Sequence, residues 1–255
     1  DVYKRQAFHT ALDEFATKRG VVVFDRMVER RLTGEPLQYV VGAWAFRSLD
    51  LMVDRRVLIP RPETEVVAGV ALDELERRAS DDRELMVVDL GTGSGAIGLS
   101  IATERADTRV LLTDVSHEAL QVARANLAGL GRAGVRVAIG QGSWYAAVPA
   151  ELRGAIDVIV SNPPYVAVAD DLPAEVRDWE PAGALIATDH GRADLRAVIE
   201  GAGEWLRPGG ALVVEMAPDQ TEWALEISAA VGFEDATVIP DLAGRDRVVR
   251  ARCPS

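Results

Sequence analysis

The segment Leu85-Met86-Val87-Val88-Asp89-Leu90-Gly91-Thr92-Gly93-Ser94-Gly95-Ala96-Ile97-Gly98 decides the fold class of this chain. Its first part is an apolar run with the length and valine content of a buried strand. Three alternating glycines follow, which allow positive φ angles and a close approach of the backbone to a ligand. The apolar residues after Gly95 predict a helix, and the first N–H groups of a helix have no partner within it. The segment is therefore expected to be a strand, a ligand-binding turn and a helix.

The same strand–helix pattern repeats along the rest of the chain. Strands are predicted at residues 85–89, 109–113, 135–139, 156–160 and 211–215, helices at 96–105, 116–127, 194–206 and 220–230, and two short terminal strands near Thr237 and Val248. Repeated βα units with short links predict an α/β fold with a mostly parallel, doubly wound sheet. In the strand order 3-2-1-4 the first and fourth strands are neighbours, and ligands bind beyond their carboxyl ends.

Two acidic residues narrow the choice of ligand. Residues 93–98 match the dinucleotide pattern G-x-G-x-x-G, and Asp114 ends the second strand, where an acid accepts hydrogen bonds from ribose hydroxyls. The alternative is that Asp114 caps the helix beginning near Ser116. A ribose is common to NAD and S-adenosylmethionine. Asp89, directly before the glycines, favours S-adenosylmethionine, which carries an ammonium and a sulfonium group and no phosphate.

A second motif, Asn162-Pro163-Pro164-Tyr165, follows the fourth predicted strand. The two prolines remove two backbone donors and end the strand abruptly. The Asn162 side chain and the Pro163 carbonyl then project as acceptors for the hydrogens of a planar NH2 group, with Tyr165 as an aromatic wall. Methyl transfer to an amide or exocyclic amine nitrogen needs such a site, although the tetrapeptide alone also fits an ordinary strand-to-loop turn. The predicted strand order brings it across one crevice from the glycines.

Composition limits the class of protein. The 255 residues carry a net charge of −12 and are 48% hydrophobic, which allows a full core in one large domain or a domain with an appendage. The acidic balance argues against sequence-specific nucleic-acid binding. One Cys and three scattered His disfavour a metal site. No run approaches the ~18 apolar residues of a membrane span and no secretory signal opens the chain, so we expect a soluble cytoplasmic protein.

The residues before the glycine segment form a separate region. Apolar residues at helical spacing, including Phe8, Leu12 and Phe15, predict a helix over residues 7–33 that Gly34-Glu35-Pro36 ends. A strand-like pattern from 44 to 59 suggests a β-hairpin or extended arm, and a helix is expected from Pro60 to about residue 78. We divide the chain into a helical N-terminal domain (1–42), a β-hairpin with a connecting helix (43–80) and a catalytic domain (81–255).

Motifs along nearly the whole chain resemble those of the release-factor glutamine N5-methyltransferases (the HemK/PrmC type). The matching segments are Gly34-Glu35-Pro36-Leu37-Gln38-Tyr39, Leu58-Ile59-Pro60-Arg61-Pro62-Glu63-Thr64-Glu65, Asp89 to Gly95, Ser161 to Tyr165, Glu180-Pro181 with Ala184-Leu185, and Gly244-Arg245-Asp246-Arg247. The Ile-Pro-Arg-Pro-Glu-Thr-Glu block is the most specific of them. The resemblance implies a seven-stranded, Rossmann-like methyltransferase sheet whose last strands are partly antiparallel, joined to a small helical N-terminal domain through a β-hairpin.

The resemblance also implies the function and roles at the site. It implies methyl transfer from S-adenosylmethionine to the side-chain amide of the Gln in the Gly-Gly-Gln motif of peptide chain release factors. The implied cofactor contacts are Asp89, Gly91, Thr92, Gly93, Ser94, Gly95, Asp114, Ser143, Trp144 and Asn162. The implied substrate contacts are Asn162, Pro163, Pro164 and Tyr165, with Asn162, Pro163 and Tyr165 as the catalytic set. Trp144 would lie beside the adenine, or alternatively pack on the core as a loop residue.

Three departures from the family pattern stand out. Ser143 replaces a frequent Asp, Ala217 replaces the Gly usual after the late-strand Glu, and only 33 residues precede Gly34. From the short N-terminal region we expect either that the helical domain is truncated or that its role in gripping the protein substrate is reduced.

Four other functions are possible from the sequence. One is methylation of another protein glutamine, as in a ribosomal protein, and a second is methylation of an exocyclic amine in nucleic acid. A third, an NAD-dependent oxidoreductase, leaves Asn162–Tyr165 without a role. The fourth is a non-catalytic module that keeps the fold.

Overall fold

A seven-stranded sheet forms the centre of the structure. The computed structural model describes residues 16–79 and 83–255. The strands are β3 (Leu85–Leu90), β4 (Thr108–Asp114), β5 (Val137–Gln141), β6 (Ile156–Ser161), β9 (Leu206–Glu215), β10 (Glu234–Pro240) and β11 (Asp246–Arg252). Their spatial order is β10-β11-β9-β6-β3-β4-β5, in which β9, β6, β3, β4 and β5 are parallel and β11 runs antiparallel to both of its neighbours, β9 and β10. The predicted doubly wound sheet, with its first and fourth strands adjacent, is confirmed.

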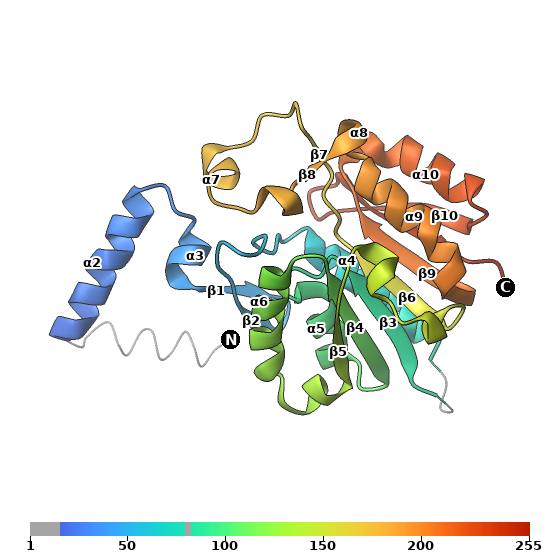
Figure 1. Cartoon of the computed structure of the whole chain (residues 1–255), viewed down its shortest axis with the longest axis horizontal. Coiled ribbons are helices and arrows are strands. Elements are labelled where there is room, and N and C mark those ends of the chain that lie inside the picture. Colours follow the sequence, from blue (N-terminus) through green and yellow to red (C-terminus); the bar gives the residue numbers. More distant parts are fainter. Residues whose placement is uncertain (1–15, 80–82) are drawn as a thin grey trace.

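Helices cover both faces of this sheet (Figure 1). They are α4 (Thr64–Arg77), α5 (Ala96–Glu104), α6 (His117–Ala128), α9 (Ala193–Trp205) and α10 (Thr221–Ala230). Successive strand residues point to opposite faces, so Val87 packs in the core formed with α4, α5 and α6, whereas Val88 packs in the core with α9 and α10. The near-continuous apolar strands thus reflect a sheet buried on both sides.

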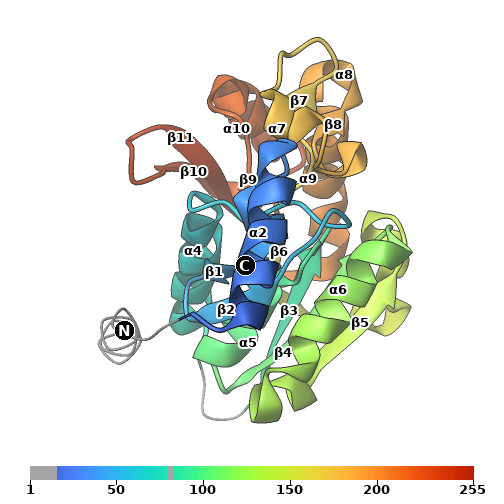
Figure 2. The same cartoon turned by 90° about the vertical axis from the view of Figure 1, so that its left-hand side faces the viewer.

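The N-terminal part extends away from the sheet (Figure 1), so α2 lies in front of the sheet when this side faces the viewer (Figure 2). It comprises α2 (Lys18–Leu32), α3 (Leu37–Val41) and the hairpin strands β1 (Ala43–Phe46) and β2 (Leu49–Met52). The Thr17 hydroxyl accepts the Gly20 amide at 3.0 Å and so caps the start of α2. Within the expected helix over 7–33, residues 18–32 are confirmed as helical, and Phe8, Leu12 and Phe15 lie outside the described residues.

The hairpin is confirmed, but it ends earlier than the strand-like pattern suggested. Residues 53–63 form an irregular connector between β2 and α4. Side chains hold this connector in place of a strand ladder: Tyr39 donates its hydroxyl to the Val57 carbonyl at 2.5 Å, and the Arg56 amide binds Asp54 at 3.0 Å. The apolar residues of the connector pack against α6 instead of continuing the hairpin.

An insertion separates β6 from α9. It contains β7 (Val166–Ala167), α7 (Ala174–Arg177), β8 (Ile186–Ala187) and α8 (Thr188–Gly191), with β7 and β8 paired in parallel. Glu180 in this insertion is buried, accepts the Ile59 amide at 3.1 Å and pairs with Arg61. A single carboxylate therefore joins the insertion to the connector.

Some element ends differ from the prediction. Strand β5 begins at Val137 because residues 131–136 form a 3-10 turn, from which Arg136 donates to the carbonyls of Arg105 and Thr108 at 2.8 and 2.9 Å. Strand β9 begins at Leu206 rather than near residue 211. The division into domains at 42/43 and 80/81 stays a prediction. Across residues 16–79 and 83–255, no helix is both long enough and apolar enough to cross a membrane.

A charge cluster occupies the edge of the sheet where the parallel strands begin. Asp157, at the start of β6, is fully buried and pairs with Arg78 at 3.0 Å, Arg83 at 2.8 Å and Arg207 at 3.5 Å. At the same edge the backbone amide of Cys253 donates to the Gly210 carbonyl at 2.8 Å. This edge holds structural contacts, and the opposite edge holds the cavity described next.

Candidate active site

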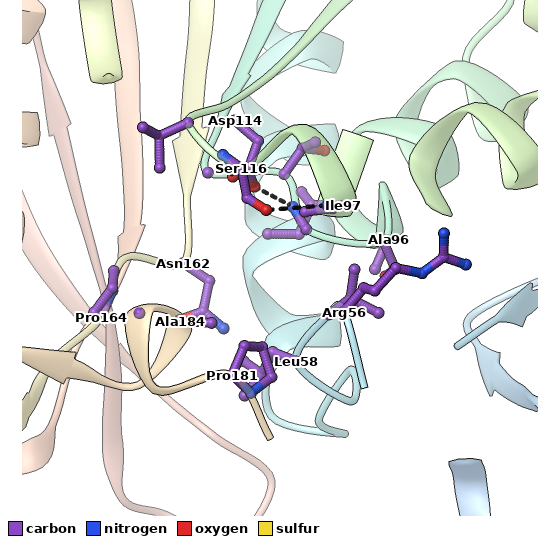
Figure 3. A pocket seen from close by; sticks show the side chains of 18 of the residues that line it. Arg56, Leu58, Ala96, Ile97, Asp114, Ser116, Asn162, Pro164, Pro181 and Ala184 are labelled. Atoms are coloured by element: carbon purple, nitrogen blue, oxygen red, sulfur yellow. Dashed lines mark hydrogen bonds between the residues drawn. The ribbon is translucent and has the colours of Figure 1, made fainter. Parts of the chain in front are cut away.

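A cavity of about 330 Å³ lies beyond the carboxyl ends of β3, β4 and β6 (Figure 3). This is the position at which ligands bind in doubly wound sheets, and the volume is within the range of small-molecule sites. The predicted residues that line it are Gly91, Thr92, Gly93, Ser94, Asp114, Ser143, Trp144, Asn162 and Pro164. Asp89, Gly95, Pro163 and Tyr165 are not part of the lining.

The glycine loop forms one wall. Gly93 has a φ of 56°, which L side chains rarely adopt, and its amide donates to Asp114 at 2.9 Å. Gly98, in the first turn of α5, lies so close to β4 that a Cβ there would be 2.2 Å from Leu112 Cδ2. Small residues are thus required both at the loop surface and beneath it.

Asp89 lies below the loop rather than in the cavity. Its Oδ2 accepts the Thr92 hydroxyl at 2.6 Å and the Gly98 amide at 2.9 Å. Its Oδ1 is buried and has no hydrogen-bond partner in the described part of the chain. Burial raises the Asp89 pKa to about 6, against the lowering effect of the Thr92 and Gly98 bonds. Asp89 therefore organises the loop and keeps one unsatisfied acceptor.

Asp114 faces the cavity from the end of β4. Its two oxygens accept the amides of Gly93 at 2.9 Å and Ser116 at 2.8 Å. Ser116, whose hydroxyl accepts the Ala119 amide at 3.1 Å, caps α6, so the alternative of Asp114 as the cap is wrong. Burial raises the pKa of Asp114, and the amide hydrogen bonds oppose that shift. Its carboxylate remains available to a ligand.

A third wall comes from the turn after β5 and the start of α9. A Cβ at Gly91 would approach the Trp144 ring at 3.4 Å, and Trp144 itself has a φ of 46°. Asp194 of α9 also lines the cavity; burial raises its pKa and a hydrogen bond with Trp144 opposes the shift. Asp194 was not predicted, because its only sequence signal was an acid in the first turn of a helix.

Asn162 reaches the cavity from the end of β6. Figure 3 shows its side chain pointing into the cavity, and its Nδ2 donates to Thr64 Oγ1 at 3.2 Å. Pro163 is buried behind it. The Tyr165 hydroxyl donates to Glu215 Oε1 at 3.0 Å, which directs this side chain toward β9. Asn162 is thus the side chain of the motif whose amide group reaches the cavity.

Sequence reasoning missed the fourth wall. The connector and the start of α4 contribute Arg56, Val57, Leu58, Pro60 and Thr64 to the lining, and the insertion contributes Pro181, Gly183 and Ala184. Most of these residues lie in or next to motifs named above. Neither their spacing nor the hydrophobic pattern shows, however, that their side chains point into the cavity. Glu180 brings the two segments together.

The charges of the lining suit a cationic ligand. Its charged members are Asp114, Asp194 and Arg56, and Arg56 is paired with Asp54 at 2.5 Å. The two cavity carboxylates have no comparable ion pair with a lining cation. Because a phosphate beside these carboxylates would be repelled, the arrangement disfavours a dinucleotide.

Comparison with known proteins gives the family. Residues 69–176 match the model of the methyltransferase small domain. Release factor glutamine methyltransferase of Xylella fastidiosa is 42% identical over 233 residues, covering 91% of this chain and 81% of the relative. The corresponding proteins of Moorella thermoacetica and Streptomyces coelicolor are 43% and 39% identical, over 88% and 98% of this chain and 77% and 85% of theirs.

This chain belongs to the release factor glutamine methyltransferase family. Solved structures share the methyltransferase fold at low identity. A methyltransferase from Pyrococcus furiosus superposes with a TM-score of 0.58 at 18% identity, over 90% of this chain and 99% of that one. The hMettl16 catalytic domain, in complex with a MAT2A 3′UTR hairpin, gives 0.64 at 13% identity, over 86% and 81%. These structures identify the fold of the family member described here.

Proposed function

We propose that this protein transfers a methyl group from S-adenosylmethionine to the side-chain amide nitrogen (N5) of the glutamine in the Gly-Gly-Gln motif of a peptide chain release factor. The observation that carries the proposal is the Asn162 carboxamide, held by Thr64 inside a cavity beside the glycine loop. The names of the relatives support the release factor as the substrate. Such a substrate also implies that the enzyme works in the cytoplasm.

The residues present fit S-adenosylmethionine. It would be held by Gly91, Thr92, Gly93, Ser94, Gly95, Asp114, Ser143, Trp144 and Asn162. The unsatisfied Oδ1 of Asp89 is a buried acceptor that a cationic ammonium would satisfy, because buried polar atoms are nearly always paired. The carboxylates of Asp114 and Asp194 add to this preference. When bound, S-adenosylmethionine supplies an electrophilic methyl carbon.

The substrate amide needs activation, because its nitrogen lone pair is delocalised into the carbonyl. Asn162 Oδ1 and the Pro163 carbonyl would accept the two amide hydrogens and increase electron density on the nitrogen. Pro164 and Tyr165 would flank the amide plane. The contribution of the protein is positioning and electrostatics, with reacting atoms near ~3–3.5 Å. The proton leaves to water after transfer.

Mass spectrometry tests the proposal directly. A release factor is incubated with the protein and S-adenosylmethionine, and we expect one added methyl on the Gly-Gly-Gln glutamine. Asn162→Ala should lower the rate by ~10²–10³-fold, the usual effect of removing one aimed polar group, while cofactor binding by calorimetry persists. Arg124→Ala, an exposed change on α6 outside the lining, is the control.

Two outcomes would contradict the proposal. One is wild-type methylation that survives in Asn162→Ala, which would remove Asn162 from the mechanism. The other is an absence of methyl on the release factor, with methyl appearing on a ribosomal protein or on nucleic acid assayed in parallel, which would establish one of the alternative substrates.

A further inference from the structure

Glu215, at the carboxyl end of β9, is fully buried and lies outside the cavity lining. Its Oε1 accepts the Tyr165 hydroxyl at 3.0 Å. Its Oε2 is buried and has no hydrogen-bond partner among the described residues. The Thr64 hydroxyl lies near enough to lower the pKa of the Glu215 carboxyl. One buried carboxylate therefore binds a residue of the Asn162–Tyr165 motif through Oε1 and leaves Oε2 open to a donor such as the hydroxyl of Thr64, the first residue of α4.

Thr64 connects this carboxylate to Asn162. Its Oγ1 accepts the Asn162 Nδ2 at 3.2 Å. A hydroxyl has one proton, and an ionised carboxylate only accepts hydrogen bonds. When the Thr64 proton points to Glu215, Thr64 can only accept from Asn162, so Nδ2 faces Thr64 and Oδ1 is left for the cavity. When that proton instead points to Asn162, the carboxamide is turned over and presents a donor.

We propose that Glu215 is a positioning residue that acts through Thr64, fixing the Asn162 carboxamide so that its oxygen faces the substrate amide. This inference rests on the proposed function, in which Asn162 accepts a hydrogen of the substrate NH2 group. In this arrangement Asn162 donates to Thr64, Thr64 would donate to the open Oε2 of Glu215, and Tyr165 donates to Oε1 of the same carboxylate. Glu215 thereby orients both side chains of the substrate motif from behind.

The charged groups around Glu215 set the pH range of this arrangement. Burial raises its pKa to about 7, hydrogen bonds from Thr64 and Tyr165 and the charge of Arg247 lower it, and the charge of Glu63 raises it. Above pH 7 the carboxylate is ionised and only accepts. Below pH 7 the carboxyl group is protonated and can donate to Thr64. Thr64 would then donate to Asn162, so the direction of both hydrogen bonds is reversed. Activity should therefore fall as the pH drops through about 7.

Kinetics of matched variants test the inference. Thr64→Val removes the hydroxyl at nearly constant shape, and we expect kcat to fall ~10–100-fold, the cost of a misplaced reacting group, with cofactor affinity retained. Thr64→Ser should recover most of the loss. Thr103, in α5, is also a helical threonine, but its hydroxyl donates to the Leu99 carbonyl, so Thr103→Val should leave kcat unchanged. Glu215→Gln should lower kcat and abolish the pH dependence near 7.

Nuclear magnetic resonance decides the inference without turnover. We expect the side-chain NH2 signals of Asn162 to shift with the same midpoint as the Glu215 carboxyl carbon, and this common titration to vanish in Thr64→Val. Wild-type kcat in Thr64→Val, an unchanged pH profile in Glu215→Gln, or independent titrations would each overturn the proposal. A wild-type protein that shows the common titration but methylates no release factor refutes the proposed function and leaves the role of Glu215 intact.

Discussion

The variant Gly98→Ala tests whether the close contact between α5 and β4 holds the glycine loop in place. The new Cβ would lie 2.2 Å from Leu112 Cδ2 and 3.0 Å from Asp89 Oδ2. Ordinary carbon contacts are at about 3.5–4.0 Å, so Leu112 must move by more than an ångström. Leu112 is fully buried in the core shared with α4 and α5, which makes that movement expensive. Overpacking of this kind costs about 1–3 kcal/mol.

Helix propensity opposes this cost. Replacing glycine by alanine within a helix gains about 1 kcal/mol, so Gly98→Ala should lower the free energy of unfolding by about 0–2 kcal/mol. Gly203→Ala is the matched control, because Gly203 lies in α9 with no atom within 4 Å of an added Cβ. It should gain about 1 kcal/mol without a steric cost. The two variants are expected to differ by the overpacking energy alone.

Urea denaturation followed by tryptophan fluorescence measures this difference as a shift of the midpoint at constant slope. Cofactor affinity should also fall in Gly98→Ala, because the Gly98 amide holds Asp89 and through it the loop. Equal midpoints for Gly98→Ala and Gly203→Ala would refute the reasoning, since they would mean that the helix can move away from the sheet freely.

Three further predictions follow from buried acids. Asp157→Asn should lower the free energy of unfolding by about 2–4 kcal/mol, because three arginines lose their partner. Burial raises the pKa of Asp157, but the hydrogen bonds from Arg83, the Met86 amide and Arg78 outweigh it and keep this pKa low. The stability advantage of the wild type in urea should therefore shrink as the pH falls below about 4. Asp114→Asn should weaken S-adenosylmethionine binding by roughly 10–100-fold in calorimetry, because hydrogen bonds from the ribose hydroxyls to a charged carboxylate are lost. An unchanged affinity would contradict the contact between Asp114 and the ribose. Burial raises the pKa of Asp89 to about 6, so Asp89 binds more protons in the folded than in the unfolded protein. The stability of the ligand-free protein should therefore decline as the pH rises from about 4 to 6. An ammonium group near Oδ1 should release that proton, and calorimetry should then show a binding enthalpy near pH 6 that depends on the buffer.

The sheet was predictable because its evidence is local. Apolar runs such as residues 85–90 and 156–161 end in glycine or proline, and those breaks fix both strand ends and helix starts. The start of β5 was misplaced because Val135 belongs to a strand-like run by composition. The side chain of Arg136 binds carbonyls of the preceding crossover, and that long-range contact favours a 3-10 turn.

The site was predictable in part. Asn162 and Asp114 were found because each follows a strand at the functional edge of a parallel sheet. Glu180 belongs to an acidic run, and only the folded chain shows that it pairs with Arg61, 119 residues earlier. Tyr165 reaches Glu215 on the neighbouring strand, and Thr64 meets Asn162 across 98 residues. Such contacts depend on side-chain direction, which sequence spacing does not determine.

The position of Cys253 has a practical consequence for spectroscopy. It is the single cysteine of the chain, and its backbone pairs with Gly210, at the end of β9 remote from the cavity. Burial and the charge of Glu234 raise its thiol pKa, so maleimide coupling needs mildly alkaline buffer. One engineered thiol at the exposed Leu32 of α2 then completes a dye pair. Fluorescence energy transfer between the two dyes would report whether the distance between α2 and the sheet changes when a release factor is added, without removal of any native cysteine.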